Sequence, residues 1–385
     1  MLQRATLSIA IVVLVACATT EPAPIPLYPP SDHGYGFSAA EFSPDGRLAA
    51  VANFNTVWIL DTRSMEEIMS FSGDYRFGTG NTLVFIDNEL IASTGKTDSE
   101  PWDMTDFHAA VRIWSIRDRY ADPVVIALPE LGQYAIALDR SASRGHLAVG
   151  GENGAVAVLE PNGHGGYEKR MLPGLNGPVL DIIFNEDGSL LAAGGVHPGV
   201  VIWNTQTLKE VGFLPVEGNV HDLELIADKR TLLVAGDELR LWKFLTEEEL
   251  KTIDDPTLAG DYITVGTAVA VYTIVAAMAG ALGGTAPVPI SPGGAPVPDY
   301  GFCTRVVDVS PSGAYLVDVH SGITKEKVRV IEVASDQVIQ RLNPRGGRTC
   351  GVAFSPDGTK LLIANNRVAR LYDTTSWQSQ DFDLD

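Results

Sequence analysis

The sequence predicts an all-β fold, a seven-bladed β-propeller of four-stranded blades, and three observations lead to this prediction. A unit made of a tight turn between two apolar strands recurs seven times along the 385 residues. The turns fall near positions 46, 88, 141, 188, 229, 313 and 358, and every interval but one suits a four-stranded blade of ~40–45 residues. The strands beside the turns are almost continuously apolar, as in sheets that are covered on both faces.

The clearest copies of the unit span residues 42–61, 184–204 and 354–373. In the first copy the turn reads Ser43-Pro44-Asp45-Gly46, and the last copy repeats it as Ser355 to Gly358. Asp-Gly between two apolar strands favours a hairpin, because Gly accepts the positive φ that a tight turn needs. Each copy therefore predicts a hairpin followed by a third strand.

Weaker copies of the unit span residues 85–115, 137–160, 225–243 and 309–331. An aromatic residue stands near the end of the third strand in several copies, for example Trp114, Trp203, Trp242 and Tyr372. Such residues supply large buried area between neighbouring blades. The seven copies together predict a propeller over residues 37–385.

These units resemble the WD-repeat family of propellers over roughly residues 36–245 and 302–383. The pairs Leu60-Asp61, Trp203-Asn204 and Tyr372-Asp373 stand where that family has Trp-Asp. The resemblance implies a closed ring that binds partners. It also implies that partners dock on the face formed by the loops that enter the first strand and join the second to the third.

The N-terminus predicts export. Residues 1–16 carry one positive charge, Arg4, followed by a short apolar run, which is the layout of a secretory signal peptide. The run ends in Leu14-Val15-Ala16-Cys17, which resembles the lipobox of bacterial lipoproteins and implies an acylated Cys17, with palmitate among the acyl groups. An ordinary signal peptide is the alternative. Residues 17–36 are proline-rich and predict an extended linker. The resemblance to bacterial lipoproteins also implies, because Ala18 and not Asp follows the cysteine, an outer-membrane anchor facing the periplasm.

Residues 246–300 predict an insertion after the fifth blade. The segment begins with Thr246-Glu247-Glu248-Glu249, a capping-box pattern for a short helix. It continues with an uncharged stretch, of which residues 262–283 are long enough to span a bilayer. Three interpretations stay open: an apolar helix or hairpin packed on the propeller or a partner, a membrane-inserted segment, and a degenerate eighth blade.

Two cysteines remain beside Cys17. Cys303 and Cys350 each precede a similar strand motif, in a compartment that permits disulfides. A disulfide between neighbouring blades and two free buried thiols are both compatible with the sequence.

Charge and composition indicate which partners to expect. The net charge of −20 argues against nucleic acid, because phosphate contacts need a basic surface. Against this acidic background, Arg305, Arg345 and Arg348 form a local positive group that predicts a docking site. Trp102, in an acidic loop, is a candidate interface anchor. The alternative for all four residues is an ordinary solvated surface.

The sequence offers no convincing catalytic motif, so we expect a binding protein and not an enzyme, with no cofactor and no metal. The leading hypothesis is an envelope-tethered scaffold that binds a protein. One alternative is a hydrolase or lactonase with a metal on the ring axis, for which Asp181, Asp222 and Asp308 on first strands are the available acids. Another alternative is an assembly factor for envelope proteins.

Overall fold

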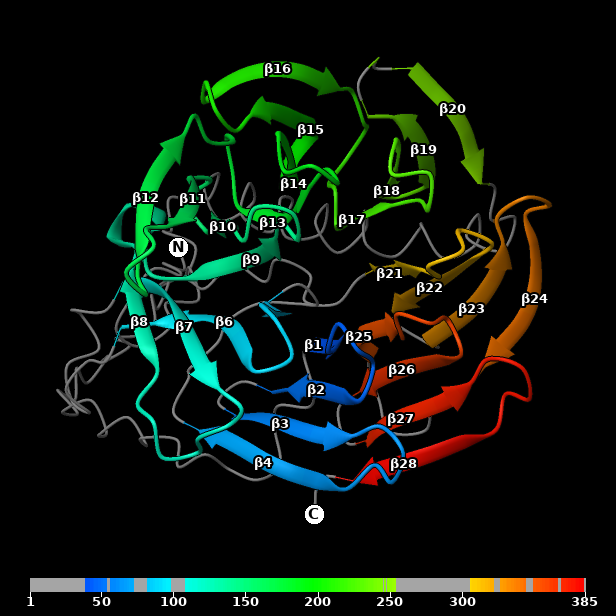
Figure 1. Ribbon diagram of the computed structural model, residues 1–385. Coiled ribbons are helices and arrows are strands. Elements are labelled where there is room, and N and C mark those ends of the chain that lie inside the picture. Colours follow the sequence, from blue (N-terminus) through cyan, green and yellow to red (C-terminus); the bar gives the residue numbers. More distant parts are fainter. Residues whose placement is uncertain are drawn as a thin grey trace, which may run out of the picture.

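The computed structural model describes residues 39–53, 56–72, 82–97, 108–244, 246, 248–253, 305–321, 326–343, 349–365 and 368–383. In these residues, strands β1 to β28 form seven four-stranded antiparallel sheets, with one 3-10 helix, η1 (Pro129–Leu131). The sheets stand side by side in a ring, and the chain runs once around it (Figure 1). The predicted seven-bladed β-propeller is confirmed.

Blades 1 to 4 comprise the first sixteen strands. In chain order these are β1 (Ala39–Phe42), β2 (Leu48–Ala52), β3 (Thr56–Asp61), β4 (Glu67–Ser72), β5 (Leu83–Phe85), β6 (Leu90–Lys96), β7 (Ala109–Ser115), β8 (Val124–Ala127), β9 (Ala135–Arg140), β10 (Leu147–Gly151), β11 (Val156–Pro161), β12 (Tyr167–Leu172), β13 (Val179–Phe184), β14 (Leu190–Gly195), β15 (His197–Asn204) and β16 (Lys209–Leu214).

Blades 5 to 7 comprise the other twelve strands. These are β17 (Asp222–Leu225), β18 (Thr231–Ala235), β19 (Leu239–Lys243), β20 (Glu248–Ile253), β21 (Arg305–Val309), β22 (Tyr315–Ser321), β23 (Glu326–Glu332), β24 (Gln337–Leu342), β25 (Thr349–Phe354), β26 (Lys360–Asn365), β27 (Val368–Asp373) and β28 (Ser379–Asp383).

The first strand of each blade is the innermost. Strand order within every sheet follows chain order, and β1, β5, β9, β13, β17, β21 and β25 contact one another in succession around the ring. The fourth strands lie at the outer rim (Figure 1). Each sheet therefore packs against a neighbour on both faces, which explains why its inner strands are almost wholly apolar.

The turns between the first and second strands form as predicted. The Ser43 hydroxyl donates to Asp45 and accepts the backbone N–H of Leu48, while Gly46 has φ +69°. Ser355, Asp357 and Gly358 repeat these contacts in blade 7. Both glycines adopt a positive φ, which explains why the pair Asp-Gly marks these turns in the sequence.

The polar residue that ends the third strand stabilises the next turn. Asp61 Oδ1 accepts the backbone N–H groups of Arg63 and Ser64. Asn204 and Asp373 make the equivalent pair of contacts in blades 4 and 7. In these three blades, a carboxylate or amide at this position caps the turn and does not reach into a neighbouring blade.

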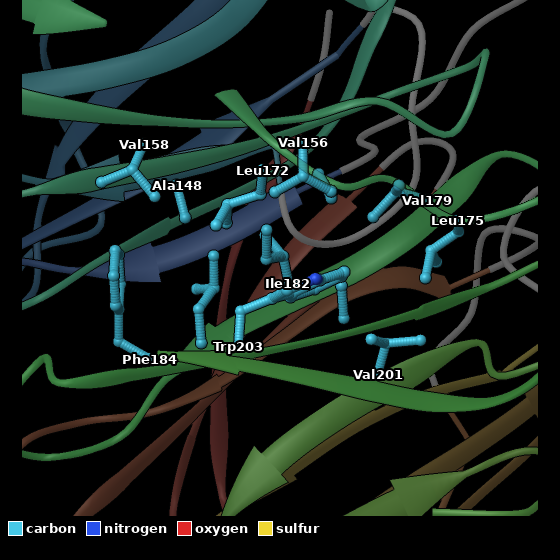
Figure 2. Packing of buried hydrophobic residues seen from close by; sticks show 13 residues of the cluster. Ala148, Val156, Val158, Leu172, Leu175, Val179, Ile182, Phe184, Val201 and Trp203 are labelled. Carbon is cyan, nitrogen blue, oxygen red and sulfur yellow. The ribbon is translucent and has the colours of Figure 1, made fainter. Parts of the chain in front are cut away.

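The hydrophobic core consists of seven separate clusters, one between each pair of adjacent blades. Figure 2 shows the cluster between blades 3 and 4, where Trp203 is fully buried beside Ile182 and Leu172. Between blades 1 and 2, Phe71 stacks on Trp114 with ring centroids 5.0 Å apart. The aromatic residues near the ends of third strands thus fill the spaces between blades.

Blade 7 is built from its own four strands, and β28 is its outer strand. The ring closes where β1 packs against β25 and β26. One cluster joins the two ends, with Phe42 and Leu60 of blade 1 against Leu362 and Leu371 of blade 7. Closure therefore rests on side-chain packing rather than on a strand shared between the ends of the chain.

Two expectations about the insertion are wrong. Glu248 and Glu249 belong to β20, the outer strand of blade 5, and not to a helix. An eighth blade between β20 and β21 is also excluded, because β17 of blade 5 contacts β21 of blade 6 directly. The segment that joins these two blades is thus 254–304, and residues 262–283 lie outside the described part of the chain.

Candidate functional site

The innermost strands surround the ring axis (Figure 1), and one position on them, here called the axial position, can be aligned across all seven blades. It lies two residues before the residue whose backbone N–H donates across the turn between the first and second strands of the blade. The seven occupants are Glu41, Val84, Asp139, Ile183, Glu224, Asp308 and Ala353. All except Ala353 are half-buried, although the residues beside them on these inner strands are mostly buried. Solvent thus reaches the inner strands chiefly at this axial position, where four of the seven residues are acids.

These four axial carboxyls, Glu41, Asp139, Glu224 and Asp308, hold protons unusually tightly. Burial raises the pKa of Glu41 to about 8, and the charges of Asp308 and Asp139 add to the effect. Burial likewise raises the pKa of Asp308 to about 7 and that of Asp139 to about 6. The pKa of Glu224 is raised well above its usual value by burial and by its acidic neighbours. Acids from blades 1, 3, 5 and 6 therefore interact across the axis.

The axial carboxyls make stability fall as pH rises. A carboxyl whose pKa is higher in the folded protein contributes stability that is complete below its unfolded pKa and decreases as pH approaches the folded pKa. For Glu41 this window runs from 4.5 to about 8. We expect the free energy of unfolding, measured by urea titration, to be lower near pH 8 than near pH 5. Glu41→Gln should reduce this difference by about 2 kcal/mol.

The matched control is Glu67→Gln, because Glu67 is exposed on the outer strand β4. Its pH profile should follow that of the unchanged protein. A Glu41→Gln profile as steep as that of the unchanged protein would contradict the role assigned to Glu41.

Four aspartates join the innermost strands of consecutive blades, and we call them the latch carboxylates. Each accepts a backbone N–H from the first strand of the next blade. The pairs are Asp139 with Phe184 at 2.6 Å, Asp181 with Leu223 at 2.6 Å, Asp222 with Val307 at 2.8 Å, and Asp308 with Phe354. The latches thus connect blades 3 to 7 in succession. Asp181, Asp222 and Asp308, the acids considered for an axial metal, all take part in this bonding.

A buried ion-pair cluster lies at the junction of blades 5 and 6. Arg305 Nε donates to Asp318 Oδ1 at 2.9 Å, and Arg329 donates to Asp318 Oδ2. Arg305 Nη1 also donates to the backbone carbonyls of Gly236 and Asp237 in blade 5, at 3.0 Å each. Burial alone would raise the pKa of Asp318, but the two arginines hold it below its usual value.

Arg305 is therefore not the surface residue that the sequence suggested. It is 3 % exposed, and its guanidinium binds groups of its own chain. The prediction failed because the sequence alone does not show that Asp318 and Arg329 lie directly opposite each other on β22 and β23. The pKa of nearby His221 is lowered to about 4 by burial and by the charges of Arg305 and His320.

Most other predicted site residues lie outside the described part of the chain. These are Cys17, Trp102, Cys303, Arg345 and Arg348. Cys350 is buried at the start of β25 and is disulfide-bonded, so the interpretation as two free thiols is wrong for it. Its pairing with Cys303 stays a prediction.

The axial carboxyls Glu41, Asp139 and Glu224 were not predicted from the sequence. A signal for three of the four axial carboxyls was present, because an acid stands two residues before a turn serine in Glu41-Phe42-Ser43, in Asp139-Arg140-Ser141 and in Asp308-Val309-Ser310. A charged residue at this place in an apolar strand predicts the axial position only once the blades are aligned by their turns.

The described residues contain no group of three or more His, Cys, Asp or Glu arranged to hold a metal ion. They also contain no helix long and apolar enough to cross a membrane. No protein-family model matches the chain, and no curated protein matches it significantly.

Proposed function

We propose that this protein is a lipid-anchored scaffold of the bacterial envelope, which binds a protein partner through one face of the propeller. This face carries the connections from each fourth strand to the next first strand and from each second to third strand. We call it the long-loop face, and the opposite side the short-turn face.

The distribution of connection lengths carries the proposal. On the short-turn face, no connection is longer than residues 116–123, between β7 and β8. Connections 73–82, 97–108 and 254–304 all leave and re-enter the propeller at the long-loop face. Long connections on a rigid scaffold are where binding residues concentrate. Trp102, Arg345 and Arg348 belong to connections of this face, on which partners dock in the WD-repeat family that the sequence resembles.

The N-terminal sequence supports the envelope location. A short apolar run ending at Cys17 predicts lipidation, and residues 17–36 provide a proline-rich spacer before β1. Cys17→Ala should move the protein from the membrane fraction to the soluble fraction and abolish incorporation of labelled palmitate. Membrane retention and labelling in this variant would contradict the proposed anchor.

Site-specific photo-cross-linking tests which face binds. A photoreactive amino acid at Asn153 or Asn219 reports on the long-loop face, and one at Thr375 or Asp228 reports on the short-turn face; all four are exposed. We expect one protein adduct of constant mass from the long-loop positions alone. The same adduct from the short-turn positions, or no adduct from any position, would refute the proposal.

A linker variant tests the segment between blades 5 and 6. Residues 256–301 are replaced with a flexible linker, which preserves β20, β21 and Cys303. Loss of the adduct would place partner binding in this segment, whereas retention would place it on the remaining loops and make Arg345→Ala and Arg348→Ala the next variants.

A further inference from the structure

A polar pocket lies at the seam between blade 7 and blade 1, on the short-turn face. Its volume is about 700 Å³, a size typical of small-molecule sites. It is lined by Arg63, Lys360, Leu371, Tyr372, Asp373, Ser376, Gln378, Ser379 and Gln380. Arg63 belongs to blade 1 and the other residues belong to blade 7, so the pocket spans the place where the ring closes.

The two cations differ in how far the protein already uses them. The Lys360 ammonium donates to the backbone carbonyl of Thr62, which leaves further N–H groups available. Arg63 is exposed, and its guanidinium forms no ion pair within the described residues. An arginine of this kind can bind a carboxylate through two parallel hydrogen bonds.

The one carboxylate in the lining is already engaged. Asp373 Oδ1 accepts the backbone N–H groups of Thr375 and Ser376 and the Ser376 hydroxyl. These hydrogen bonds hold the pKa of Asp373 below its usual value, so it stays ionised. Asp61 adds a second carboxylate near the two cations, because the charges of Arg63 and Lys360 contribute to its lowered pKa. Two cations against two anions leave no net positive charge around the pocket, which disfavours a dianion relative to a monoanion.

The rest of the lining suits hydroxyl groups. Gln378, on the turn before β28, and Gln380, which pairs with Leu371 on the face toward blade 1, present two exposed amides. Each amide both donates and accepts hydrogen bonds, as a polyol does. The buried Leu371 forms the apolar part of the pocket, whereas the Tyr372 side chain packs on the opposite face of the blade, in the cluster between blades 6 and 7.

We propose that this seam pocket binds a small acidic sugar, a polyhydroxylated monocarboxylate. Its carboxylate lies between Arg63 and Lys360, and its hydroxyl groups bond to Gln378 and Gln380. A ligand held in this way connects blade 1 to blade 7, so binding also stabilises the closed ring. The site lies on the opposite face from the proposed protein-binding loops and is independent of them.

The test uses the purified protein and D-glucuronate as the probe, followed by titration calorimetry and thermal unfolding. We expect saturable binding with a dissociation constant on the order of 1 mM. At about 10 mM glucuronate the Tm should rise by roughly 2 °C. D-glucose, which lacks the carboxylate, should bind at least about tenfold more weakly, the loss expected on removing a charge-assisted bidentate pair. Glucose 6-phosphate, a dianion, should also bind more weakly than glucuronate.

Two arginine variants make the test specific. Arg63→Gln should weaken glucuronate binding about tenfold without lowering the Tm of the free protein, because Arg63 is exposed and forms no ion pair within the described residues. Arg47→Gln is the matched control, since Arg47 is an exposed arginine on the same face of blade 1 but outside the pocket. Its binding should be unchanged. Absence of saturable binding, equal affinity for glucose, tighter binding of glucose 6-phosphate, or an unaffected Arg63→Gln variant would each overturn the proposal.

Discussion

Replacing Asp318 with Asn is expected to lower the free energy of unfolding by about 3–5 kcal/mol. The Asp318 carboxylate is fully buried and compensates the charges of Arg305 and Arg329, which are also buried. Without it, two guanidinium groups remain in the interior with no counter-charge from this cluster. Arg305 would also lose the partner that orients it toward the Gly236 and Asp237 carbonyls, so blades 5 and 6 would separate more easily.

A second ion pair at the same junction provides the control. Lys251 of β20 pairs with Asp336 at 2.6 Å, and both side chains are one-third exposed. Asp336→Asn removes the same charge and keeps a residue type that tolerates the positive φ found there, so it should cost less than about 1 kcal/mol. Both variants are compared by urea unfolding. If both variants lowered the free energy of unfolding by the same amount, burial would not explain the contribution of the Asp318 cluster to stability.

Removing a latch carboxylate is the second large change, and Asp181→Ala should cost about 2–3 kcal/mol. Asp181 is 1 % exposed, and its Oδ2 is the acceptor for the backbone N–H of Leu223. Alanine removes the acceptor supplied by the neighbouring blade and leaves this buried N–H only Asp222 Oδ1 of its own strand, at 3.0 Å. The missing bond is one that holds blade 4 to blade 5, and hydrogen bonds to charged groups contribute about 1.5–3 kcal/mol.

Asp181→Asn separates the hydrogen bond from the charge. Its amide oxygen can still accept the Leu223 N–H, so we expect it to recover more than half of the loss seen with alanine. Hydrogen exchange followed by mass spectrometry should show faster exchange in the β17 segment for the alanine variant than for the asparagine variant. Identical exchange in the two would argue against the latch.

Local chemistry explains why the fold was predictable from the sequence. The turn at Ser43 to Gly46 needs a positive φ and a side-chain oxygen, and both requirements appear in four consecutive residues. Six of the seven first turns contain a residue with positive φ, and the seven turns recur at intervals that with one exception suit a blade, which determines the number of blades.

What the sequence did not reveal depends on contacts between distant residues. Glu248 and Glu249 suggested a helix start, but they lie on an outer strand, where one face meets solvent and polar residues are tolerated. The backbone pairing of these two residues with β19 places them in a strand and not in a helix. The burial of Arg305 depended in the same way on the register of β22 with β21 and β23, which no local pattern encodes. The predicted docking residues Trp102, Arg345 and Arg348 lie outside the described part of the chain, so their role stays a prediction.

The junction between blades 1 and 7 is where we expect the propeller ring to open most easily. The cluster at this seam is rich in small side chains: Ala40, Ala49, Ala353, Ala364 and Ala369. Chain connections join each of the other pairs of neighbouring blades but not this one, so the two ends can part without stretching a connecting segment. We therefore expect blades 1 and 7 to separate first under heat or tension. The other blade junctions should separate afterwards, one at a time.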